Sequence, residues 1–185
     1  MAYCLQFDMP SGVVYATFFV MPLYIPSQNR YYTYGNRISS LHHSKLLPLS
    51  KSASDDELNV WCELLCYYLE KFVFPFFQEI STPSKLVKVI EKKKYLAGPF
   101  FFCPPVQVSR LLLFSYLYTE DFEKLHLLTK KYPHIIQDST FFTEPVRNFY
   151  LEENEVIAQL AQKDIQEARA FCSQTIEDTL RNCFG

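Results

Sequence analysis

The chain has 185 residues and a formal net charge of −2, with 17 Phe, 13 Tyr and only 4 Gly. This near-neutral charge argues against a nucleic-acid surface, which needs a concentrated basic face, and the high apolar and aromatic content excludes a disordered chain. Four scattered glycines cannot build the loop of a dinucleotide site or a P-loop. The length suits a single domain at 1–185, large enough to bury its own core.

The first part of the chain, 1–38, predicts an antiparallel β-meander of three strands. Apolar residues alternate with polar or small ones at 3–9, the pattern of a half-buried strand, and the Pro-Ser-Gly sequence at 10–12 supplies a turn. The β-branched and aromatic run at 13–21 predicts the second strand, and 31–34 predicts the third. Because the sheet starts at the first residues, we expect its cover to come from the helices that follow.

A polar loop at 39–53 leads to the longest helical pattern, at 54–77. Ser54 followed by Glu57 predicts a capping box, in which hydroxyl and carboxylate satisfy backbone N–H groups of the first turn. Pro75 removes a backbone donor, so we expect the helix to end or kink just before it. Seven apolar residues recur at three- and four-residue steps and should form the buried side: Leu58, Trp61, Cys62, Leu65, Leu69, Phe72 and Phe76.

Shorter helical elements occupy the middle of the chain. Thr82 followed by proline is typical of a helix start, and Gly98 is typical of its end. The apolar run at 100–103 fits either a short buried strand or an extended plug. A helical hairpin is predicted at 108–133, with its two helices joined by the polar residues 119–121.

The last element begins after Thr143 and contains no Gly or Pro at 146–184. An unbroken helix of this length would overhang a compact globule. We therefore expect one of two arrangements. Either the helix breaks near 152–154, where Asn154 caps a second helix, or its end past Ile165 projects and packs on a partner.

The sequence predicts no catalytic frame, no metal site and no cofactor. Cys62 and Cys66 stand four residues apart, but no second Cys or His pair matches them, so we interpret both as core residues. His42 and His43 form a histidine pair. An uncharacterised enzyme with a small-molecule pocket around this pair and Asp8 remains an alternative hypothesis.

The cellular compartment is predicted from cysteine usage and from the N-terminus. The start of the chain lacks the basic and then apolar pattern of a signal peptide, and no uncharged apolar run reaches membrane-spanning length. Six scattered cysteines are typical of reduced thiols and not of a disulfide scaffold. We expect a cytoplasmic protein that engages neither membrane nor nucleic acid.

Four tyrosines near the meander are candidate partner-binding residues: Tyr24, Tyr31, Tyr32 and Tyr34. Tyrosine is enriched at binding interfaces, and part of this set should reach the surface of a sheet that has no earlier element to cover it. Ordinary packing beneath helices is the alternative interpretation.

Two short segments resemble a pattern found in small uncharacterised bacterial proteins of the α+β class: FFVMPLYIP at 18–26 and YGNRI at 34–38. Some proteins of this kind and size are immunity proteins, which block a toxin. The resemblance therefore implies a protein that binds another protein and carries no catalytic motif.

These observations predict an α+β fold, with a three-stranded antiparallel meander followed by a bundle of five to six helices at 54–184. The leading hypothesis is a non-enzymatic binding protein, such as an immunity or anti-toxin inhibitor, that uses the tyrosine face or the last helix. A self-associating structural protein is the third hypothesis. It would form a homodimer through the apolar stripe at 157–183.

Overall fold

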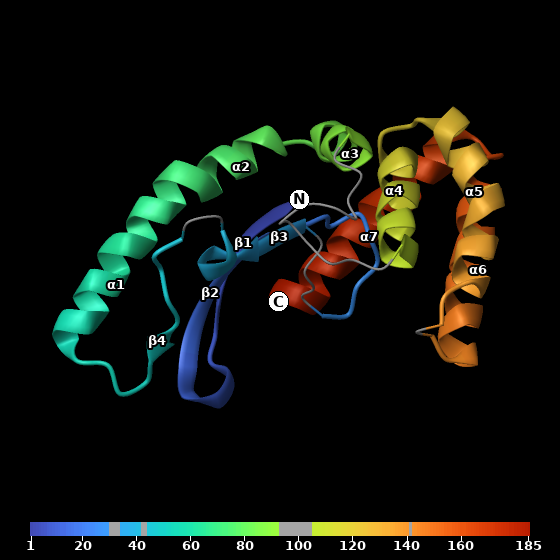
Figure 1. Ribbon diagram of the computed structural model, residues 1–185. Coiled ribbons are helices and arrows are strands. Elements are labelled where there is room, and N and C mark those ends of the chain that lie inside the picture. Colours follow the sequence, from blue (N-terminus) through green and yellow to red (C-terminus); the bar gives the residue numbers. More distant parts are fainter. Residues whose placement is uncertain (30–33, 42–43, 93–104, 141) are drawn as a thin grey trace. The chain divides into compact units, whose positions relative to one another are not determined.

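The computed structural model of the chain describes residues 1–29, 34–41, 44–92, 105–140 and 142–185 (Figure 1). An antiparallel sheet comes first and helices follow, so the predicted α+β class is confirmed. The chain divides into two compact units, of which the first contains Met1–Pro22 and Tyr31–Phe102 and the second Leu23–Arg30 and Cys103–Gly185. This division falls inside the predicted helical part of the chain, not between the sheet and the helices.

The sheet begins with the predicted hairpin. Strand β1 (Ala2–Asp8) pairs antiparallel along its whole length with β2 (Val13–Met21). Ser11 and Gly12 make the turn, with φ angles of 56° and 79°. Positive φ is the left-handed region that glycine enters at little cost, which explains a glycine at this place.

The third strand completes the meander. Strand β3 (Tyr34–Arg37) pairs antiparallel with β2 and runs past the predicted end at Tyr34, while residues 31–33 of the predicted strand lie outside the described residues. A short strand that the sequence did not predict, β4 (Leu49–Ser50), also pairs with β2. Gly35 lies against β2 so closely that a Cβ atom there would be 2.0 Å from the carbonyl oxygen of Phe18.

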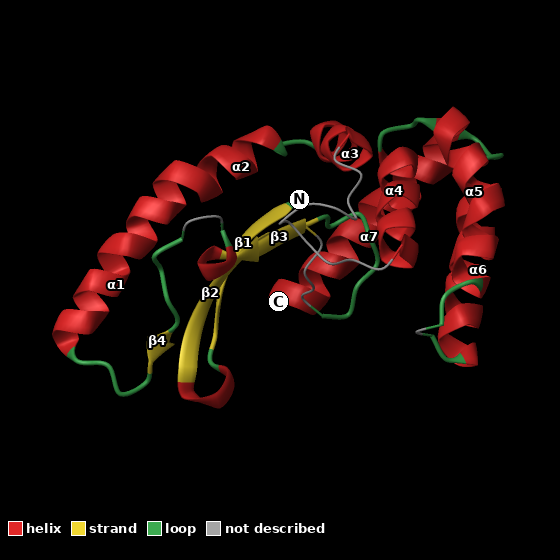
Figure 2. Ribbon diagram, viewed as in Figure 1, coloured by secondary structure: helices red, strands yellow, loops and turns green. Residues whose placement is uncertain are grey.

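The helix predicted at 54–77 is one continuous rod made of α1 (Asp55–Tyr68), a π-helical turn (Leu69–Val73) and α2 (Phe74–Glu79) (Figure 2). Pro75 does not end the helix, so the first predicted alternative is wrong, whereas the second, a kink, has its counterpart in the π turn that interrupts the regular α-helix just before it. At the end of the π turn the N–H of Phe74 donates to the carbonyl of Leu69, five residues back instead of four. This wider turn makes room for the proline ring, which in a regular α-helix would press on the carbonyl four residues earlier.

The rod begins at the predicted capping box. The Ser54 Oγ accepts a hydrogen bond from the Glu57 backbone N–H at 3.3 Å, and the Ser54 N–H donates to Glu57 Oε2 at 2.8 Å. The Ser54 N–H and the Ser54 hydroxyl, which donates to the same Oε2 at 3.0 Å, favour the ionised carboxylate and hold the pKa of Glu57 below its usual value. The start of the helix was therefore predicted correctly.

The rod covers one face of the sheet (Figure 2). Phe76 packs edge-on against Phe18 of β2, with 5.3 Å between ring centroids, and stacks on Tyr34 of β3 at 5.5 Å. Trp61 contacts Phe7 of β1 at 6.2 Å. The expectation that helices cover the sheet is confirmed for this face.

The first unit continues into helix α3 (Pro83–Lys92). Thr82 caps it as predicted, since its Oγ1 accepts a hydrogen bond from the Lys85 N–H at 3.2 Å. The predicted helix stop at Gly98 and the apolar run at 100–103 both lie outside the described residues.

The second unit contains four helices: α4 (Pro105–Tyr118), α5 (Phe122–Gln137), α6 (Glu144–Leu160) and α7 (Ile165–Phe184). Helices α4 and α5 form the predicted hairpin. Helices α6 and α7 are separate, but the break lies at 161–164, so its predicted position at 152–154 is wrong. Asp164 marks the true break, because its side chain caps α7 by accepting a hydrogen bond from the Gln166 N–H at 3.1 Å.

Asn154 lies in the middle of α6 and caps no helix. Its buried side chain donates from Nδ2 to the carbonyl oxygen of Thr129 in α5, at 3.1 Å. In a regular helix that carbonyl would accept from the N–H of residue 133, which here is a proline and has none. Asn154 therefore replaces the donor that Pro133 removes.

Helix α7 packs on its own unit. Its Ala168, Cys172, Thr179 and Cys183 are buried, and the helix contacts α4 and α6. The predicted alternative in which the chain past Ile165 projects is therefore wrong. No helix in the described ranges is long and apolar enough to cross a membrane.

Candidate functional site

Two of the four candidate tyrosines are buried. Tyr24 is 1 % exposed, its hydroxyl hydrogen-bonds Ser115 Oγ at 3.0 Å, and its ring stacks on Tyr118 at 4.6 Å. Ordinary packing, the alternative weighed for this set, describes its role.

Tyr34 is 5 % exposed and stacks on Phe76 beneath α2. Burial, with the nearby Glu79 carboxylate, raises the pKa of Tyr34 to about 12. Neither Tyr24 nor Tyr34 offers its ring to a partner, and Tyr31 and Tyr32 lie outside the described residues.

The cysteine and histidine pairs were the residues considered for metal binding or catalysis. Cys62 and Cys66 are exposed, so their interpretation as core residues is wrong. Nowhere in the described ranges do three or more His, Cys, Asp or Glu side chains gather in a way that could hold a metal ion. His42 and His43 lie outside those ranges, and the pocket expected around them stays a prediction.

Strand β1 and the residue that follows it carry four exposed apolar residues, which we name the β1 strip: Tyr3, Leu5, Phe7 and Met9. The register places Leu5 opposite Phe18 of β2, so the strip continues the face that the helical rod covers. The rod contacts β1 through single aromatic pairs, such as Tyr3 and Phe77, whose ring centroids lie 5.1 Å apart. The strip therefore forms an uncovered rim beside the rod.

Three of the seven residues predicted to be buried along the rod are exposed. The residues at three- and four-residue steps along it form what we name the α1 seam: Leu58, Cys62, Leu65, Leu69 and Phe72. Leu65 is buried, but Leu58 and Phe72 are 43 % and 42 % exposed and Cys62 is exposed too. The prediction that this whole side is buried is wrong for those three residues.

The strip and the seam are neighbours on the first unit. Trp61, which touches Phe7 of the strip, is flanked along α1 by Leu58 three residues before it and Leu65 four residues after it. Together they form one apolar surface along the rod and the edge of the sheet.

A cavity lies at each end of the rod. One, of about 370 Å³, is lined by Tyr3, Phe74, Phe77, Gln78 and Ser81. The other, of about 360 Å³, lies between the loop that contains Leu47 and Pro48 and the α1 residues Val60, Trp61 and Leu64. The Trp61 Nε1 donates to the Leu47 carbonyl at 2.9 Å and fixes the wall of the second cavity.

The rod is strongly acidic. Residues 55–79 contain six carboxylates and one lysine, a net charge of −5, whereas the whole chain carries −2. Asp56, Glu63 and Glu70 recur at seven-residue steps and are exposed, so they form an acidic row along the helix, about 140° around its axis from the centre of the seam. None of the three forms an ion pair with another described residue.

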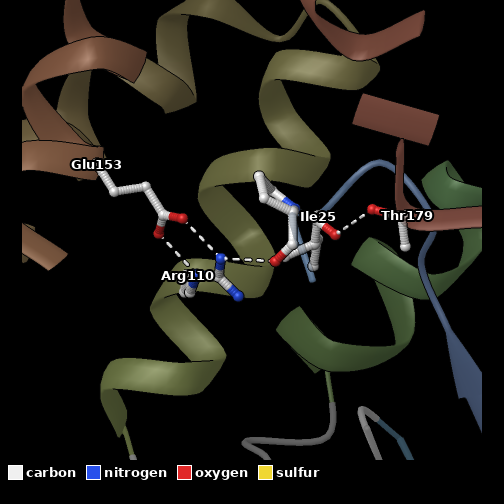
Figure 3. A network of polar contacts seen from close by, with 5 residues as sticks. Ile25, Arg110, Glu153 and Thr179 are labelled. Atoms are coloured by element: carbon white, nitrogen blue, oxygen red, sulfur yellow. Dashed lines mark hydrogen bonds and ion pairs between the residues drawn. The ribbon is translucent and has the colours of Figure 1, made fainter. Parts of the chain in front are cut away.

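A second polar cluster lies in the second unit (Figure 3). The Arg110 guanidinium binds the Glu153 carboxylate through two hydrogen bonds of 2.6 Å and also donates to the Pro26 carbonyl at 3.1 Å. Thr179 Oγ1 donates to the Ile25 carbonyl at 3.2 Å. These bonds hold Ile25 and Pro26 against α4 and α7.

This cluster is structural. The hydrogen bonds described above join Arg110, Glu153 and Thr179 to one another or to backbone carbonyls of the same unit. Burial and the neighbouring Glu153 raise the pKa of Tyr132, which keeps its phenol protonated. The sequence did not predict the cluster, because its members lie 43 to 154 residues apart.

Comparisons with known proteins found no matching family model, no matching curated protein and no matching solved structure. The functional argument therefore rests on the surface of the chain itself.

Proposed function

We propose that this chain is a non-enzymatic binding protein that engages another protein through the α1 seam and the β1 strip. The observation that supports this most is the exposure of Leu58 and Phe72 on one side of the helical rod, at 43 % and 42 %, and of Phe7 on the strand that contacts the rod, at 52 %. Monomeric proteins rarely leave large contiguous apolar patches in water, and such patches mark interaction sites.

The proposal keeps the predicted binding role but assigns it to the α1 seam and the β1 strip instead of the tyrosine face or the last helix. The resemblance to small bacterial immunity-type proteins favours an inhibitor, which would act by occupying its target. The homodimer hypothesis loses support, because Ile157, Cys172, Thr179 and Cys183 of its stripe are buried inside the second unit.

Affinity capture with surface variants tests the proposal. Leu58→Asp and Phe72→Asp place a charge on exposed seam positions, and Leu127→Asp places the same charge on a 54 % exposed leucine of α5 as the matched control. The tagged full chain and each variant would be used to capture partners from lysate of the native host at increasing salt. Thermal unfolding of each variant would confirm that it folds.

We expect the wild type and Leu127→Asp to retain one stoichiometric protein at high salt, since an apolar interface is not screened by salt. Both seam variants should lose this captured protein, because the interface would bury a carboxylate that has no partner, at a cost of roughly several kcal/mol. Equal capture by all four proteins would refute a binding site on the seam.

A further inference from the structure

Among the described strands, β1 lies at an edge of the sheet. The strand order is β1-β2-β3, with β4 also on β2, so β2 is the only described strand that pairs with β1. Successive residues of a strand turn their N–H and C=O groups toward opposite edges, so about half of the backbone groups of Ala2–Asp8 face away from β2. An edge of this kind is completed by another strand, because an extended backbone presents donors and acceptors at the matching spacing.

This edge carries none of the features that usually protect an edge strand from pairing. Strand β1 contains no Pro, Lys or Arg, and its one charged residue, Asp8, stands at its end. Its register with β2 runs from Ala2 to Asp8 without a bulge. Seven residues at about 3.3 Å each give an edge of roughly 23 Å, long enough to align a whole strand.

The side chains of β1 specify the pattern of the strand that would be added. Tyr3, Leu5 and Phe7 are exposed, stand at every second residue and form the rim beside the rod. Their cross-strand neighbours would be apolar, because an apolar pair across a ladder buries part of both side chains. The added strand therefore has an apolar residue at every second position.

Charge indicates which residues stand between the apolar ones and argues against a second copy of this chain. The rod at 55–79 carries a net charge of −5. It contacts β1 through two aromatic pairs, Phe7 with Trp61 and Tyr3 with Phe77. Pairing two copies edge to edge would bring two such acidic rods together. A strand with lysine or arginine between its apolar residues is instead attracted by the field of the rod as a whole.

We infer that the protein partner adds a strand to β1: an extended segment in which apolar residues beside the β1 strip alternate with lysine or arginine. The segment runs antiparallel to β1, as every pair of strands in the described sheet does. This inference rests on the proposed function and specifies how the partner meets β1.

The first test uses the full chain and four synthetic heptapeptides, labelled for fluorescence polarisation. One has Val at its four odd positions and Lys between them, and the second replaces each Lys with Glu. The other two keep the Val/Lys sequence and carry three N-methyl groups, either on the Lys residues or on the last three Val residues. Because successive N–H groups point to opposite edges, each methylated peptide loses donors along one edge only.

We expect the Val/Lys peptide to bind and to protect backbone amides at 2–8 from hydrogen exchange. One methylated peptide should bind about as well, and the other about tenfold or more weakly, since only the edge that faces β1 donates to it. The Val/Glu peptide should bind about tenfold more weakly at low salt, and added salt should narrow this difference.

Three results would overturn strand addition: no protection at 2–8, equal binding of the two methylated peptides, or loss of binding in both. A Val/Glu peptide that binds as tightly as the Val/Lys peptide would overturn the basic character of the segment.

The second test uses the variants Leu5→Pro and Gln6→Pro. These residues are neighbours, so the N–H of one points to β2 and the N–H of the other points away. Proline at the inward position breaks a ladder bond and lowers Tm, whereas proline at the outward position should leave Tm near that of alanine at the same position. We expect this stable proline variant to bind the Val/Lys peptide about tenfold or more weakly than its alanine counterpart, which keeps the N–H, and to lose the captured protein.

The two proposals fail on different results. Capture of the protein partner by the stable proline variant would overturn the inference, and the proposed function fails only if Leu58→Asp and Phe72→Asp still capture that partner. A dimer of the full chain in light scattering that the stable proline variant converts to a monomer would assign the edge to a second copy, and would also overturn the inference.

Discussion

The hydrogen bond between Asn154 and Thr129 offers a test of how the second unit tolerates a proline inside α5. Replacing Asn154 with alanine removes the Nδ2 donor, at 3.1 Å, from a carbonyl that Pro133 already deprives of its helical partner. An unsatisfied buried acceptor costs about 1–3 kcal/mol. For a chain of this size, about 2 kcal/mol corresponds to a fall in Tm of about 4–8 °C.

A double-mutant cycle isolates this effect. Asn154→Ala also removes the side chain's own Oδ1, which is buried and has no donor among the described residues, so the single variant alone underestimates the bond. Pro133→Ala restores the backbone N–H that can donate to the Thr129 carbonyl. In that background Asn154→Ala should lower the free energy of unfolding by at least about 1 kcal/mol less than it does in the wild type. The free energies of unfolding of the four proteins would be measured by urea denaturation. Equal costs of Asn154→Ala in both backgrounds would refute the replacement of one donor by the other.

Three further predictions concern both units. Arg110→Ala should destabilise the chain by about 3 kcal/mol, since it leaves the Glu153 carboxylate partly buried and unpaired, and Arg110→Met/Glu153→Leu should recover most of this loss in the same urea assay. Gly35→Ala should lower Tm by several degrees, because its Cβ would lie 2.0 Å from the Phe18 carbonyl oxygen; an unchanged Tm would contradict the close approach. Burial raises the pKa of Tyr34 to about 12, so the folded state keeps a proton that the unfolded state releases above pH 10, and stability should fall from pH 10 to 12. Tyr34→Phe should show a shallower alkaline loss in a pH series of thermal unfolding.

Local features were predictable from the sequence because neighbouring residues determine them. The capping box of Ser54 and Glu57 and the turn at 10–12 depend only on residues within one turn of the chain, and both are confirmed. For Pro75 the sequence predicted an end or a kink of the helix just before the proline, but not the π turn that lies there. A π turn removes the clash, and no short-range signal announced it.

Features that depend on distant residues escaped prediction. Asn154 has the chemistry of a helix cap, and only the fold shows that Pro133, 21 positions earlier, leaves a carbonyl for it to satisfy. Asp164, which caps the start of α7, carries a local signal in the sequence, because an aspartate just before an apolar stripe is typical of a helix start.

For the proposed binding surface, the sequence predicted the apolar side of the helix but not its exposure. The periodicity of the α1 seam correctly showed an apolar side of a helix, but periodicity cannot say what covers that side. Leu58, Cys62 and Phe72 were predicted to be buried because the chain was assumed to cover this side of the helix, and the tyrosines were predicted as the binding surface in its place.

The most direct test of the central claim is hydrogen exchange of the full chain with and without its captured partner. The account predicts new protection at 55–73 and 2–8, the residues of the α1 seam and the β1 strip, and no change in α5 and α6. Protection confined to the second unit, with exchange at 55–73 unchanged, would contradict it.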